Sequence, residues 1–94
     1  MAYCEAWLGA RKVREENGEG RTEFRVELAT PPNTELPTGY VPSEKEPEIP
    51  DKTVYSSPWL RTIESAKNEL IKVDSFCKSK GYKVLIYFEI RGAY

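Results

Sequence analysis

The chain has 94 residues and a formal net charge of −1, with 39% hydrophobic, 12% aromatic and 31% charged residues. This length predicts a single domain over residues 1–94, and the aromatic content argues against an unfolded chain. No apolar run is long enough for a transmembrane span, and no basic stretch followed by an apolar one marks a secretory signal, so we expect a cytoplasmic protein without a membrane partner.

Two segments near the N-terminus alternate between apolar and polar residues, a pattern that predicts two strands. They cover residues 2–13 and 21–29, and Asn17-Gly18 between them is typical of a β-hairpin turn. A two-residue turn would leave the apolar residues of the two strands on opposite faces. We therefore expect a loop with an odd number of residues or a bulge near Gly9, because either one unites the apolar faces. These faces consist of Cys4, Ala6, Leu8, Phe24, Val26 and Leu28.

The segment 30–56 is rich in proline and acidic residues, a composition typical of an extended linker. Apolar residues such as Tyr40, Val41 and Ile49 nevertheless recur along it. Long loops within a domain are uncommon, so we expect this segment to be ordered against the body of the domain, with residues 52–55 as a short edge strand. We also expect its acidic residues to lie near the lysine-rich end of the helix that follows.

A helix is predicted after this segment. Ser57 is a suitable N-cap, and Pro58 suits the first helical position. Apolar residues then recur every three or four positions, as on one face of a helix. Gly81 is the expected left-handed cap at the C-terminal end, with Tyr82 as its apolar contact. The stripe consists of Trp59, Ile63, Ala66, Leu70, Val73 and Cys77.

A final strand is predicted from Lys83 to about Arg91, beside the first strand and antiparallel to it. The face expected to meet the helix carries Val84, Ile86, Phe88 and Ile90, and the outer face carries Leu85, Tyr87, Glu89 and Arg91. Because both faces have apolar residues, the strand needs shelter at its edge. A short strand of the proline-rich segment or a second copy of the chain, in a homodimer, would supply it.

The expected fold is α+β, because the helix must bury its apolar stripe on one face of the sheet. It consists of a small antiparallel sheet in a β-β-α-β order, with one helix on one face and a long proline-rich loop between the second strand and the helix. The opposite face keeps Trp7 and Tyr87 outside the helix-facing core.

The composition offers few groups for catalysis. The chain has no histidine, which removes the commonest general base and metal ligand, and its two cysteines are too few for a structural zinc site. Neighbouring carboxylates such as Glu15 and Glu16 lie in polar loops, where water keeps them ionised. We expect no enzymatic activity, no cofactor and no metal. Cys4 and Cys77 are expected to be reduced and buried, the alternative being one disulfide between the first strand and the helix.

Two surfaces are candidates for binding. The outer sheet face carries Trp7, Arg25, Tyr87 and Arg91, and the acidic segment forms an arm with Tyr40, Glu44, Glu46 and Glu48. With the free strand edge, these predict a non-enzymatic protein-binding module or inhibitor, a type of small domain frequent among accessory and phage-encoded proteins. Single-stranded nucleic-acid binding on the open sheet face is the alternative, disfavoured by the slightly acidic chain.

Overall fold

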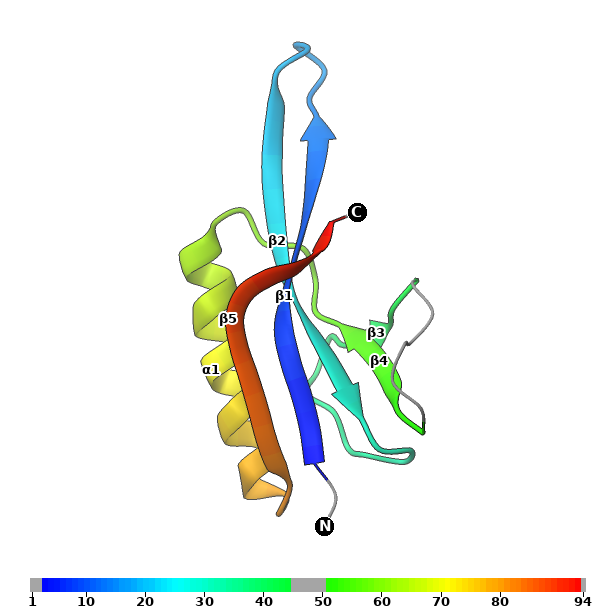
Figure 1. Ribbon diagram of the computed structural model, residues 1–94. Coiled ribbons are helices and arrows are strands. Elements are labelled where there is room, and N and C mark those ends of the chain that lie inside the picture. Colours follow the sequence, from blue (N-terminus) through cyan, green and yellow to red (C-terminus); the bar gives the residue numbers. More distant parts are fainter. Residues whose placement is uncertain (1–2, 45–50, 94) are drawn as a thin grey trace.

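The protein forms one five-stranded sheet with a helix packed against one of its faces (Figure 1). The computed structural model describes residues 3–44 and 51–93. The elements in these ranges are β1 (Tyr3–Arg14), β2 (Gly20–Thr30), β3 (Val41–Pro42), β4 (Thr53–Ser56), α1 (Ile63–Ser79) and β5 (Lys83–Ala93). The α+β class is confirmed. The strand order, β3-β4-β2-β1-β5, corrects the simpler β-β-α-β arrangement by adding β3 and β4.

The hairpin loop holds an odd number of residues, which is one of the two arrangements expected from the sequence. Arg14 pairs with Gly20, and the Glu15 N–H donates to the Glu19 carbonyl at 2.8 Å, so Asn17 lies at the centre of the loop. Gly18 follows with φ of 85°, a conformation that glycine adopts without strain. The resulting register pairs Ala6 with Leu28 and Leu8 with Val26, which unites the apolar faces. The hairpin tip extends beyond α1 (Figure 1).

The added strand β4 explains why the direction of β5 differs from the prediction. A short strand was expected over residues 52–55, and β4 confirms one there, but it pairs with β2 and not with the last strand. Because β4 runs antiparallel to β2, the chain enters α1 from the opposite end of the sheet. It therefore returns in β5 parallel to β1, where we had expected an antiparallel pair.

The helix begins later than predicted, because the expected cap is used by the sheet. The Ser57 N–H donates to the Val26 carbonyl at 3.0 Å, and the Ser57 hydroxyl accepts from the Val26 N–H at 2.9 Å. Leu60 continues this pairing with Phe24. Thr62 is the N-cap instead, and its hydroxyl accepts from the Ser65 N–H at 3.1 Å. The assignment of Ser57 as the N-cap was therefore wrong, as was the place of Trp59 in the helical stripe.

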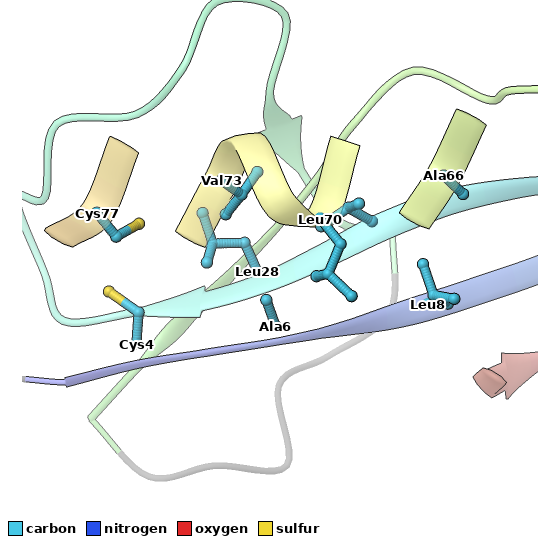
Figure 2. Packing of buried hydrophobic residues seen from close by; sticks show 9 residues of the cluster. Cys4, Ala6, Leu8, Leu28, Ala66, Leu70, Val73 and Cys77 are labelled. Carbon is cyan, nitrogen blue, oxygen red and sulfur yellow. The ribbon is translucent and has the colours of Figure 1, made fainter. Parts of the chain in front are cut away.

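The core lies between α1 and the sheet face formed by β1 and β2 (Figure 2). Four of the predicted stripe residues face this core from the helix, and the strands supply the apolar face that the hairpin unites. The fully or almost fully buried members are Cys4, Ala6, Leu8, Val26, Leu28, Ala66, Leu70, Val73 and Cys77. The helix has 17 residues, and no helix in the described ranges is both long and apolar enough to cross a membrane.

The C-terminal end of α1 confirms the predicted cap. Gly81 has φ of 85°, its N–H donates to the Lys78 carbonyl, and the Tyr82 N–H donates to the Cys77 carbonyl at 3.1 Å. These two bonds form a Schellman motif. Tyr82 packs against the core, as expected.

Gly81→Ala is expected to lower the free energy of unfolding by about 1 kcal/mol, because alanine is strained at a positive φ. A Cβ at this position would meet no atom within 4 Å, so the cost arises from the backbone alone. Gly20→Ala is the control, since Gly20 has no positive φ and space around its Cβ position. Urea unfolding of both variants measures the difference, and equal effects would contradict this role for Gly81.

The last strand departs from its predicted pattern after Ile86. Ala6 pairs with Ile86 and Leu8 with Ile90, so β5 advances four residues where β1 advances two. β5 bends at this irregularity, and its C-terminal part follows β1 as far as Ala10 (Figure 1). Phe88 and Ile90, which we expected to face the helix within the core, are 49% and 47% exposed.

Candidate protein-interaction surface

Trp7 and Tyr87 lie outside the helix-facing core, as the sequence predicted. Trp7 alternates with the buried Ala6 and Leu8 and therefore points to the opposite face of the sheet. Tyr87 lies where the register of β5 shifts, and the Arg91 guanidinium stacks 3.7 Å from its ring centre. Both aromatic rings are partly buried. This side of the sheet is thus free of the helix but already engaged in contacts of its own.

Arg25 is an internal residue of this outer face. Its side chain is 5% exposed, and its Nε donates to Glu27 at 2.8 Å. Its Nη2 lies 2.9 Å from Glu44 Oε1, and its guanidinium lies 4.1 Å from the centre of the Trp59 ring. Burial leaves little of Arg25 for a partner to contact, so its ion pairs serve the fold.

A ladder of charged residues extends this network along the hairpin. The Arg11 guanidinium also stacks on the Trp59 ring, 4.3 Å from the ring centre. Its Nη2 lies 2.8 Å from Glu23 Oε1. Arg21 bonds both Glu23 and Glu15. The Arg11 guanidinium, with help from Arg21, holds the pKa of Glu23 below its ordinary value. These opposite charges satisfy one another within the chain, which disfavours this face as a nucleic-acid surface.

The residues of the predicted acidic arm do not form one surface. Tyr40 packs against the core on the helix side, where its hydroxyl donates to Glu69 at 2.9 Å; burial and the Glu69 charge raise its pKa. Glu44 lies on the other side with Arg25. Glu46 and Glu48 lie outside the described residues. Glu35 pairs with Lys80 at 3.0 Å, which agrees with the expected position of the acidic segment near the basic end of the helix.

The outer side of β5 is an open edge of the sheet. In the described ranges β5 pairs only with β1, so the main-chain groups along its other side have no strand beside them. Leu85 on the outer face is 43% exposed, and Phe88 and Ile90, further along β5, are also exposed. The opposite edge differs, because β3 has two residues and one of them is Pro42, which has no N–H to offer.

The helix also has one exposed apolar side chain. Ile71 is 51% exposed and points away from the buried face of α1 formed by Ala66, Leu70, Val73 and Cys77. It is therefore not part of the β5 edge. We name the surface formed by Leu85, Phe88 and Ile90 the β5 edge surface.

Sequence reasoning found part of this surface and missed the rest. It predicted an apolar last strand whose edge needs shelter, but it placed Phe88 and Ile90 in the core. Within the described ranges no three cysteine or carboxylate side chains gather as a metal site would require. Comparison of the chain with family models, curated proteins and solved structures found no match to any of them.

Proposed function

We propose that this chain is a protein-binding module, or an inhibitor, that adds an extended segment of another protein to the β5 edge. The carrying observation is an 11-residue edge strand with exposed apolar side chains and no described strand on the side away from β1. In strand addition, main-chain hydrogen bonds supply affinity and alternate side chains supply specificity. Exposed apolar residues that cluster on a small protein are typical of such contact sites. No catalytic step is assigned.

Charge around the β5 edge surface suggests the chemistry of the partner. Lys67 lies on the opposite side of α1 from Glu69, the residue bonded to Tyr40, and Lys83 begins β5. A segment that pairs with β5 would pass both ammonium groups. We therefore infer a partner strand with apolar residues at alternate positions and carboxylates at its ends.

Phe88→Lys is expected to weaken partner binding by about tenfold or more, because it places a charge in the apolar contact. Val41→Lys is the matched control, since Val41 is also an exposed apolar residue but lies at the opposite edge of the sheet. The partner is first captured with the wild-type chain, and both variants are then titrated with the purified partner. Thermal unfolding of each variant confirms that it is folded.

Hydrogen exchange tests the mode of binding. The β5 amides that point away from β1 should exchange more slowly in the complex, because strand addition gives them acceptors. Equal loss of affinity in Phe88→Lys and Val41→Lys, or unchanged exchange in β5, would overturn the proposal. A wild-type chain that dimerises alone, and loses the dimer in Phe88→Lys, would assign the edge to a second copy instead.

The structure disfavours single-stranded nucleic-acid binding as the competing function. Of the residues that this alternative used, Arg25 is buried in ion pairs and Arg91 is bonded to Glu89 at 2.9 Å. Glutamates accompany each arginine on this face. Binding to single strands that falls steeply with salt concentration would favour the alternative over ours.

A further inference from the structure

The two cysteines of the chain meet across the interface between the helix and the sheet. Cys4 lies near the start of β1, and Cys77 lies in the last turns of α1. Both are buried, and in Figure 2 their side chains lie opposite one another between α1 and β1, with the Cys4 sulfur pointing toward Cys77. Both are free thiols here, in agreement with the expected reduced state. The alternative expected from the sequence, one disulfide between the first strand and the helix, would join the same two side chains.

The surroundings make the two thiols unequal. The Cys77 thiol lowers the pKa of Cys4 against the effect of burial, and the charge of Lys52 acts in the same direction. The Lys52 Nζ donates to the Tyr3 carbonyl at 2.6 Å, which places an ammonium group beside the start of β1. The neighbouring Cys4 and burial raise the pKa of Cys77. Thiolates are the attacking species in disulfide exchange, so Cys4 is the nucleophile of the pair.

Both cysteines lie at ends of their elements, where local opening costs least. Cys77 is followed by the Schellman motif at Gly81, and Cys4 is the second residue of β1. Opening of the last helical turn would expose both thiols without unfolding the rest of the core.

We propose that Cys4 and Cys77 form a reversible dithiol–disulfide site that reacts with low-molecular-weight disulfides such as glutathione disulfide. The Cys4 thiolate attacks one sulfur of the reagent, the reagent's S–S bond breaks, and one glutathione thiolate leaves. The Cys77 thiol then loses its proton and attacks the Cys4 sulfur, which releases the second glutathione thiolate. Each released thiolate takes up one of the two protons from the protein thiols. Two protein thiols are thereby oxidised, and one disulfide is reduced to two thiols.

The disulfide form would join α1 to β1 through the core. This effect does not depend on the proposed partner binding. The bond closes a loop that contains most of the chain, and constraints of this kind reduce the conformational freedom of the unfolded state. We expect oxidation to raise the thermal midpoint by about 10 °C or more, and a thiol reductant to reverse the rise.

The test uses the full chain in glutathione buffers, followed by acid quenching and mass spectrometry. Ring closure predicts the loss of two hydrogen masses without an adduct. The ratio of oxidised to reduced chain should follow the glutathione disulfide concentration divided by the square of the glutathione concentration. A single mixed disulfide with glutathione would instead follow the glutathione disulfide concentration divided by the glutathione concentration. Cys77→Ala is the control: it should retain a glutathione adduct on Cys4 and show no rise in midpoint.

The wild-type measurements decide the outcome even if Cys77→Ala does not fold. A native chain that stays reduced in buffers that oxidise the urea-unfolded chain would overturn the proposal. So would a glutathione adduct without ring closure, a disulfide between two chains, or ring closure that lowers the midpoint.

Discussion

Glu27→Ala is expected to lower the free energy of unfolding by about 3–5 kcal/mol, because it removes one partner of a buried ion pair. The Glu27 side chain has no exposed surface; it accepts from Arg25 at 2.8 Å and from the Ser56 hydroxyl at 2.5 Å. The change leaves the buried guanidinium without its nearest carboxylate, and the Ser56 hydroxyl without its acceptor. Urea unfolding at neutral pH, extrapolated to water, measures the loss.

The chain contains a matched control for this prediction. Arg91 and Glu89 form an ion pair at 2.9 Å with the same spacing along a strand, but both side chains are exposed. Exposed pairs contribute about 0–1 kcal/mol, so Glu89→Ala should have little effect. If both variants lose the same stability, the buried position of Glu27 is not what makes its ion pair important.

Leu70→Ala is expected to cost about 2–5 kcal/mol, because it opens a cavity between α1 and the sheet. Leu70 has no exposed surface and lies over β1 and β2 (Figure 2). Ile71→Ala changes the next residue along the helix, which is half exposed, and should change stability by about 0.5 kcal/mol at most. Thermal and urea unfolding compare the two. A loss of less than 1 kcal/mol in Leu70→Ala would contradict this account of the core.

Periodicity predicted the parts of the fold that depend on a single element. The helical stripe from Ala66 to Cys77 and the alternation of Phe24, Val26 and Leu28 each reflect one buried face, and both were correct. The odd hairpin loop could be inferred because only that register places both apolar sets on one side. Local chemistry was also sufficient for the cap at Gly81, which needs a positive φ.

The remaining features depend on partners that are distant in sequence. Ser57-Pro58 has the local pattern of a helix start, but the Ser57 hydroxyl bonds Val26, 31 residues away. This contact draws Trp59 out of the helix and over two arginines. The bulge in β5 could not be predicted from the sequence either. The alternation of side chains continues through it, but the register against β1 shifts.

For the candidate site, the sequence predicted only that the edge of the apolar last strand has to be covered by another strand. One unused signal was present: Arg21, Glu23, Arg25 and Glu27 alternate in sign on one face of a strand. Such an alternation indicates ion pairs along the face, and it could have placed Arg25 in the interior network instead of a binding surface.

The projecting hairpin tip offers a practical advantage for these experiments. Its loop lies ten residues along β1 from Glu5, the residue that pairs with Leu85, which corresponds to about 33 Å of extended strand. The loop residues from Glu16 to Gly20 are exposed, and loop tips of this type tolerate inserted residues. A fluorophore or an affinity tag inserted at Asn17 would therefore report on the protein from a site remote from both the thiol pair and the start of β5.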